Sequence, residues 1–293
     1  MIKSVTFIIG LTLGLLSMFG KSYARQIPEL PVGPVTGEGI AVLETNIYEG
    51  IEPPSSEDIS WQRQNPANGL TTLLIQNKWM PYGIGKTNSF SIEPSWPIRL
   101  AKNWEIITYT VIPFQRVPGP KPGTSSDSGL GNISLEMLFH PDKPESFISW
   151  GLGPFLLFPA HSELGFTSFS IGPSLLLYLN GGICTGGIKL RNCWSTGAHE
   201  NDRVNLFSSE YYFYFNLPEA WYFQSNATIT ANWLTASTDR WLIPVGGGPG
   251  KTFRIGNSKS FYSAGIQGFW NVVRPDSAGS WMLSAQFQII FSG

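Results

Sequence analysis

The alternation of side chains from Trp221 to Trp233 limits the fold of this chain more than any other feature. One parity holds Gln224, Asn226, Thr228, Thr230 and Asn232, and the other holds Phe223, Ala227, Ile229, Ala231 and Trp233. Because successive side chains of a strand point to opposite faces, the segment predicts a strand with one polar and one apolar face. About ten alternating residues between aromatic ends match a tilted strand that crosses a bilayer. Such a strand needs partners that close the sheet into a barrel, because open edges do not occur in lipid.

Similar β segments follow one another from Gly69 onward. The predicted strands are Leu70–Trp79, Phe90–Leu100, Trp104–Gln115, Leu130–His140, Phe147–Phe158, Thr167–Leu179, Ile183–Trp194, Val204–Asn216, Trp221–Leu234, Trp241–Ile255, Phe261–Val273 and Trp281–Phe291. A charged fraction of 13%, with 32 Gly and 22 Pro, fits an all-β chain with many turns. We therefore predict an all-β fold, a transmembrane antiparallel β-barrel of about 12 strands over residues 69–293. The alternative is a soluble β-sandwich or lipocalin-like barrel, which would turn the apolar parity inward and leave the long strands and their polar rows harder to explain.

The predicted connections alternate in length. Short turns fall at Leu100–Asn103, Asn180–Gly182, Leu217–Ala220 and Gly256–Lys259, whereas longer loops fall at Val117–Gly129 and Ser195–Arg203. Short turns at one end and long loops at the other are typical of outer-membrane barrels. An even number of strands after a periplasmic N-terminus would place the long loops outside the cell.

The last predicted strand carries a further signal. Leu283, Ala285, Phe287, Ile289 and Phe291 alternate with Ser284, Gln286 and Gln288, and Ser292 and Gly293 extend beyond the final aromatic residue. This pattern resembles the signal that the barrel-insertion machinery reads in the last strand. The expected partners are therefore this machinery and outer-membrane lipid.

The N-terminus predicts export from the cytoplasm. Lys3 precedes an apolar run from Val5 to Phe19, and Ser22–Ala24 provides the small residues of a signal-peptidase site. Residues 1–24 are therefore predicted to be a signal peptide, with an uncleaved membrane anchor as the alternative. A net charge of −1 gives no basis for a nucleic-acid partner.

Residues 25–68 differ from the rest of the chain because they are rich in proline and lack strand periodicity. One short helix is predicted from Ser55 to Gln64, with Ser55 or Ser56 as its cap, two acids in its first turn and Pro66 after its end. This arm could plug the barrel or extend into the periplasm, and the sequence leaves both alternatives open.

A glycine-rich segment from Gly246 to Thr252 resembles a phosphate-binding loop. The Walker pattern requires glycine where this chain has Val245, and no helical pattern follows Thr252. We therefore expect no nucleotide site. The glycines fit a strand in which side chains would crowd a neighbour, or a β-bulge that bends the barrel.

The histidines and cysteines suggest neither catalysis nor metal binding. His140, His161 and His199 fall at strand ends or in loops, and no serine, histidine and third group form a catalytic set. Cys184 and Cys193 lie nine residues apart on one predicted strand, about 30 Å apart when extended, which excludes a disulfide unless that strand is a hairpin turning at Gly186. No cofactor, metal or catalytic residue is predicted.

Charged and polar residues on the predicted inner parities are the candidates for a functional role. They are Glu93, Glu136, Lys189, Arg191, Glu210, Asn226, Thr228, Asn232 and Arg254. Mixed charges inside a barrel could line a permeation path or form a structural network that fills the barrel. We hypothesise that the three glutamates face the three basic residues across a narrow lumen and set its selectivity.

Several short motifs resemble one family of outer-membrane barrel proteins, the family named for the meta-pathway of phenol degradation. The residues that carry the resemblance are Gln64–Pro66, Ser128–Asn132, Trp150–Pro154, Gly172–Ser174, Thr228–Trp233, Asp239–Trp241, Pro244–Gly248, Lys251, Phe253–Gly256 and Asn271–Pro275. Asn132 stands where the family has an acid, and Pro249 interrupts its glycine–lysine run. The resemblance covers most of residues 64–291 and implies a Gram-negative outer-membrane barrel of transporter type, without assigning binding residues.

The sequence therefore favours a channel that passes small hydrophobic or aromatic molecules across the outer membrane. Two alternatives remain open. One is a barrel enzyme that acts on outer-membrane lipid, and the other is a structural or adhesion barrel that works through its loops.

Overall fold

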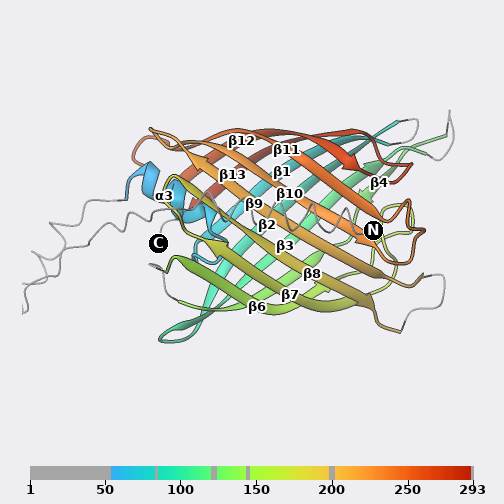
Figure 1. The fold of residues 1–293 in the computed structure, drawn as a ribbon, viewed down its shortest axis with the longest axis horizontal. Helices are drawn as coiled ribbons and strands as arrows, with labels where there is room; N and C mark the ends of the chain where they lie inside the picture. The colour runs from blue at the N-terminus through green and yellow to red at the C-terminus, as the bar shows by residue number, and fades with distance from the viewer. Residues whose placement is uncertain (1–53, 83–84, 120–123, 143–145, 198–201, 292–293) are drawn as a thin grey trace, which may run out of the picture.

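The chain forms a closed, twelve-stranded antiparallel β-barrel with one short helix at one end (Figure 1). The structure is a computed structural model and describes residues 54–82, 85–119, 124–142, 146–197 and 202–291, so the predicted signal peptide and residues 25–53 lie outside the described residues. Its elements are α3 (Ser56–Gln64), β1 (Thr71–Tyr82), β2 (Gly85–Ala101), β3 (Trp104–Val117), β4 (Asp127–Leu130), β5 (Ser134–Pro141), β6 (Ile148–Leu157), β7 (Ser170–Leu179), β8 (Cys184–Ser195), β9 (Asn205–Asn216), β10 (Trp221–Asn232), β11 (Trp241–Arg254), β12 (Phe261–Val273) and β13 (Trp281–Phe291). Neighbouring strands pair throughout, and β1 pairs with β13 to close the wall.

The predicted strands are confirmed, and one of them is interrupted. The fourth, expected from Leu130 to His140, is divided into β4 and β5. Between these pieces, the Asn132 amide donates to the carbonyls of Phe158 and Phe166 and accepts from the Phe166 amide. Asn132 therefore leaves the strand to fix the connection between β6 and β7, which the alternation of side chains could not indicate.

Connection length follows the predicted asymmetry. At the end that carries α3, called the α3 end below, residues 102–103, 180–183, 217–220 and 255–260 join consecutive strands. At the opposite end, the connections span residues 158–169, 196–204, 233–240 and 274–280. Only the step from β1 to β2 is short at that end. The first strand begins and the last strand ends at the α3 end, as an even number of strands requires.

The outer face of the barrel is apolar and carries aromatic side chains near both ends. Exposed tryptophans near the α3 end are Trp104, Trp150 and Trp221, and those near the opposite end are Trp194, Trp233, Trp270 and Trp281. The exposed aliphatic side chain of Ile266, in the interior of β12, lies between these two belts. A belt of this kind fits the apolar band and interfacial aromatics of a barrel in a bilayer.

Part of the outer parity of β10 departs from the sequence expectation. Ile229 is only 7% exposed, and it packs in a cluster with Tyr211, Ala227 and Ile243. Neighbouring side chains from β9 and β11 cover the small residues of β10. The apolar parity of a bilayer-crossing strand should face lipid, but Ile229 on that parity contacts other side chains of the wall instead.

The glycines of β11 fill the role predicted for them. A Cβ atom at Gly246 or Gly248 would lie 2.0 or 2.1 Å from a carbonyl oxygen of β12. The pairing of β11 with β12 also shifts register between Ile243 and Pro244. Lys251 has the outward parity near the α3 end, and its ammonium lies 4.8 Å from the centre of the Trp221 ring. Crowding and a register irregularity, not phosphate binding, explain this segment.

Both cysteines are free thiols. They lie on the single strand β8, as predicted. The hairpin alternative at Gly186 is therefore excluded.

Helix α3 is the predicted helix of the arm. Ser55 caps it, because its hydroxyl accepts from the Asp58 amide while the Asp58 carboxylate accepts from the Ser55 amide. Glu57 and Asp58 lie in its first turn, where the helix dipole favours acids. Among the described residues, no helix has the length and apolar character needed to cross a membrane.

The outward side chain of Ile266 provides a test of the apolar band. Ile266 is 48% exposed in the interior of β12. Ile266→Arg should lower the free energy of unfolding by about 2–4 kcal/mol, because it places a charge in lipid near the midplane. Ile255 is 57% exposed just beyond the end of β11, so Ile255→Arg is the matched control and should cost about 0–1 kcal/mol. Urea unfolding in phospholipid vesicles measures both, and equal costs would contradict the assigned outer face.

Candidate functional site

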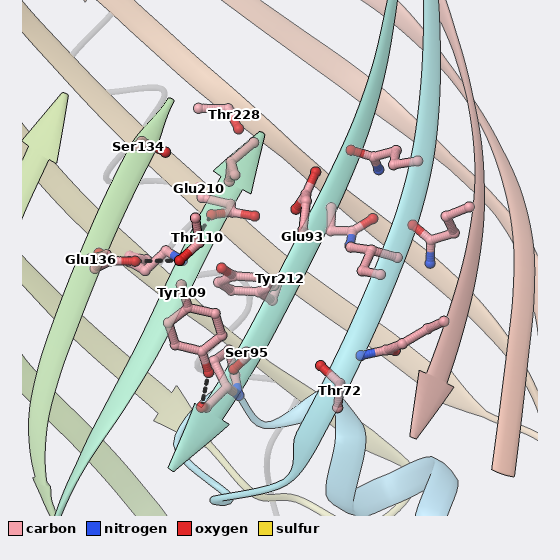
Figure 2. Close-up of a pocket in the computed structure, with 18 of the residues that line it drawn as sticks. Thr72, Glu93, Ser95, Tyr109, Thr110, Ser134, Glu136, Glu210, Tyr212 and Thr228 are labelled. Carbon is pink, nitrogen blue, oxygen red and sulfur yellow. Dashed lines mark hydrogen bonds and ion pairs between the residues drawn. The ribbon is translucent and has the colours of Figure 1, made fainter. Parts of the chain in front are cut away.

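A cavity of about 330 Å³ lies inside the barrel. Its walls come from residues 63–66 of the arm and from strands β1, β2, β3, β5, β6, β8, β9, β10 and β13. Figure 2 shows Glu93, Glu136, Glu210 and Tyr109 pointing toward this space from different strands. Small-molecule sites in proteins typically have volumes of about 300–1,000 Å³, so the cavity can hold one small molecule.

Four charged side chains form a compact network on one wall. The Lys189 ammonium lies 2.9 Å from Glu136 and 3.2 Å from Glu210. The Arg191 guanidinium lies 3.3 Å from Glu210 and 3.8 Å from Glu136. The Ser174 hydroxyl also donates to Glu136. The two positive and two negative charges balance, and Lys189 and Glu136 are 4% and 2% exposed.

Tyrosine rings enclose this network. The Lys189 ammonium lies 4.8 Å from the centre of the Tyr109 ring and 5.9 Å from that of Tyr212. The Arg191 guanidinium lies 5.0 Å from the Phe155 ring. The π faces of aromatic rings attract cations, so these contacts help to fix both basic side chains. The network is a rigid part of the wall and leaves few of its own groups free for a solute.

Two further charges on the barrel strands, Glu93 and Lys78, line the cavity outside the network. The Glu93 carboxylate accepts from the Ser91 hydroxyl at 2.6 Å. Lys78 also lines the cavity, on the inward parity of Gln76. These side chains, with Gln286 and the tyrosines, give the cavity a polar wall with aromatic patches.

The arm closes the α3 end of this cavity through Arg63. Its guanidinium lies 4.4 Å from the centre of the Tyr222 ring and 5.7 Å from that of Tyr214. It also donates to Thr252 at 3.1 Å and to Gln288 at 3.3 Å. These partners lie on β9, β10, β11 and β13, so one side chain spans that side of the barrel.

The residues after Arg63 reach the other side. The buried amide of Gln64 donates to Asn216 at 2.7 Å and accepts from Thr185 at 2.9 Å. Asn65 donates to Ser149 at 2.9 Å and to Asn180 at 3.0 Å. Beyond it, the Tyr109 hydroxyl donates to the Pro66 carbonyl.

An apolar contact anchors the same arm. Ile59 of α3 is buried with Phe261 and Ile290. The described part of the arm therefore lies inside the α3 end of the barrel, and its role as a plug stays a prediction. We refer to residues 55–68 as the plug below.

The structure brings together most of the candidate residues named from sequence. Those that line the cavity are Glu93, Glu136, Lys189, Arg191, Glu210, Asn226 and Thr228. Asn232 instead lies at the end of β10, where its side chain accepts from the Leu234 amide and shapes the following turn. Their predicted role in transport remains a prediction.

Arg254 does not join the opposed charges. It is the last residue of β11, at the α3 end, and its guanidinium lies 4.8 Å from the Phe261 ring in an exposed position. The expectation that it faces the glutamates is wrong because the barrel wall carries it beyond the level of the network.

The candidates named from sequence omit seven cavity residues with charged or amide side chains: Arg63, Gln64, Asn65, Gln76, Lys78, Gln286 and Gln288. Lys78 shares the parity of Gln76 in the first predicted strand, so alternation could have identified it. Arg63 and Gln64 lie at the end of a helix without strand periodicity, and no pattern there indicates that they enter the barrel.

The described residues offer no catalytic or metal-binding constellation. None of them form a group of three or more His, Cys, Asp or Glu side chains able to hold a metal ion. His161 and Ser162 both contact the Glu163 carboxylate in an exposed connection, and the serine hydroxyl donates to that carboxylate. Ser162 is therefore not activated by His161, which nucleophilic catalysis would require.

The balanced network makes a testable contribution to stability. Lys189→Met leaves two buried carboxylates, Glu136 and Glu210, with Arg191 as their one cation in the network. The unbalanced buried charge should lower the free energy of unfolding by about 3–5 kcal/mol. The double variant Lys189→Met with Glu136→Gln removes the stranded charge and should recover part of this loss. Urea unfolding of the folded barrel measures both variants. A single variant as stable as the wild type would show that the network contributes no stability.

No protein-family model matches the chain, and no curated protein matches it. Among solved structures, the chain is similar to an outer-membrane channel from Pseudomonas putida F1, with a TM-score of 0.57 and 12% identity over 76% of this chain and 96% of that one. It also aligns with the NanC porin, with a TM-score of 0.48 and 10% identity over 75% of this chain and 100% of that one. The CymD monoaromatic hydrocarbon channel aligns with a TM-score of 0.39 and 7% identity over 83% of this chain and 95% of that one. The first of these likenesses shows that the chain shares the barrel fold of that channel.

Proposed function

We propose that this protein is an outer-membrane channel for small molecules. The observation that carries the proposal is the polar cavity inside a closed barrel whose outer face is apolar. A wall with this polarity separates an aqueous interior from lipid, which is the arrangement of a membrane-spanning barrel. The fold shared with the Pseudomonas putida F1 channel also supports it.

The cavity favours a channel over the two alternative functions. A lipid-hydrolysing barrel needs an activated nucleophile, and the described serines and histidines form no such pair. An adhesion barrel needs no hollow interior, and its lumen can be filled with side chains. The balanced charge network leaves room for a solute beside it.

The lining also favours a class of solute. Tyr109, Tyr212 and Tyr214 present ring faces or hydroxyls to the cavity, and Asn226 and Thr228 present hydrogen-bonding groups. We propose that the solute is a small aromatic or largely hydrophobic molecule, with polar atoms tolerated at its edge. The cavity volume limits passage to one such molecule at a time.

The plug predicts a small conductance for the wild-type protein. Arg63→Ala with Gln64→Ala removes the side chains that bridge the α3 end, so single-channel conductance in a planar bilayer should rise. The matched control is Arg254→Ala, which removes a cation at the same end but outside the cavity, and it should leave conductance unchanged. A wild-type protein that is already a wide ohmic pore would contradict the role of the plug.

The proposed location is the outer membrane, reached after export through the inner membrane. We expect the full chain, expressed in a Gram-negative host, to fractionate with outer membranes and to migrate differently on gels before and after heating. A folded barrel resists unfolding by detergent until it is heated. Recovery in the soluble periplasmic fraction would contradict this location.

A further inference from the structure

The wall between β10 and β11 contains the longest break in strand pairing among the described strands. The paired register stops at Gln224 with Gly248 and resumes at Thr230 with Leu242, which leaves residues 225–229 and 243–247 unpaired with each other. Breaks in the other strand pairs span two residues of a strand at most. Strand β1 pairs without interruption with both β2 and β13. This part of the barrel wall is therefore held together by something other than a backbone ladder.

Side chains replace the missing ladder. The Gln267 carbonyl oxygen, from β12, accepts from the Asn226 backbone amide at 3.1 Å, and its amide group donates to the Asn226 side chain. Gln267 is almost fully buried and reaches across β11 where that strand has glycines. A buried backbone N–H without a partner is costly, so Gln267 satisfies a group that β11 leaves free.

Two further hydrogen bonds join the strands across the break. The Ser225 hydroxyl donates to the Gly246 carbonyl at 2.5 Å, and the Tyr211 hydroxyl donates to the Pro244 carbonyl at 3.2 Å. Side-chain bonds of this kind can be broken individually, whereas a backbone ladder separates cooperatively. At this place a few side chains hold the wall closed, and we call Gln267, Ser225 and Tyr211 the latch.

The break connects the cavity with apolar surroundings. On the inside, Asn226, Ala227 and Thr228 all line the cavity, so the β10 side of the break borders the solute space. Within the wall, Tyr211, Ala227, Ile229 and Ile243 form a buried apolar cluster with Phe269. On the outside, Val245 is exposed on the apolar face.

We propose that the break between β10 and β11 is a lateral portal through which an apolar, aromatic-sized solute passes between the cavity and the bilayer. The inference rests on the proposed function and specifies the route of its solute. The latch of Gln267, Ser225 and Tyr211 opens, and the apolar cluster provides the walls of the passage. Water and ions are not favoured along it because these walls offer them few partners.

The test bridges the portal covalently. In a background carrying Cys184→Ser and Cys193→Ala, Ala227→Cys and Val245→Cys are introduced into the full chain and joined by oxidation or a short bismaleimide. The matched control joins Ala264→Cys to Phe287→Cys, which are register partners on the fully paired strands β12 and β13. Entry of the apolar dye N-phenyl-1-naphthylamine into cells reports the lateral route, and single-channel conductance of purified protein reports the lumen.

The portal predicts a selective loss. Bridging β10 to β11 should reduce dye entry to the level of cells without the protein, reduction of the disulfide should restore it, and conductance should not change. The control bridge should affect neither readout. Dye entry that persists with the bridge formed, while conductance is normal, would overturn the portal alone.

A second variant keeps the test decisive if the bridge prevents folding. Gln267→Leu removes the latch and should increase dye entry. The control Ser284→Ala changes a buried polar residue that does not line the cavity and lies on fully paired strands, so it should not increase dye entry. Equal dye entry for both variants would overturn the portal. A wild-type protein that shows neither conductance nor dye entry would overturn the proposed function, and the portal with it.

Discussion

The structure depends on one constraint, which is that every backbone N–H and C=O group in an apolar surrounding needs a partner. A sheet satisfies these groups between strands, and only closure removes its two edges. Pairing of β1 with β13 provides that closure here. Alternation then follows, because each strand presents one parity to the outside and the other to the interior. Apolar side chains outside and polar side chains inside are two consequences of the same closed ladder.

The many polar side chains that point into the barrel find partners in two ways. Lys189 and Arg191 balance Glu136 and Glu210, so the network adds little net charge to the cavity. The plug satisfies a second set of inward groups, because Arg63 and the residues after it bind partners on opposite walls. What remains is a cavity that is small and polar, with aromatic patches. Where the ladder itself fails, between β10 and β11, the side chain of Gln267 supplies the missing partner.

The alternation of polar and apolar side chains predicted the strands well. Along the whole height of the wall, successive side chains of a strand point by turns to the outside and to the interior. Strand β6 alternates less regularly, yet its predicted range, Phe147–Phe158, exceeds the observed Ile148–Leu157 by only one residue at each end. The interruption at Asn132 escaped prediction because it depends on bonds to a connection remote in sequence. Most of the candidate residues that the alternation placed inside the barrel do line the cavity. The alternation could not show which charges lie at the same level, so Arg254 was grouped with carboxylates that it does not approach. Nor could it show that Arg63 enters the barrel, since the arm has no strand period.

The central claim is that the barrel has a lipid-facing outer surface and a hydrated interior. Spin labels at single cysteines, in the background without Cys184 and Cys193, test it in protein reconstituted into phospholipid vesicles. Oxygen concentrates in lipid, and a water-soluble nickel chelate remains in water. A label at Ile266→Cys should be relaxed more by oxygen, and one at Thr228→Cys more by the nickel chelate. The reverse pattern, or equal accessibility at both positions, would mean that the apolar face is not in lipid and would contradict the account.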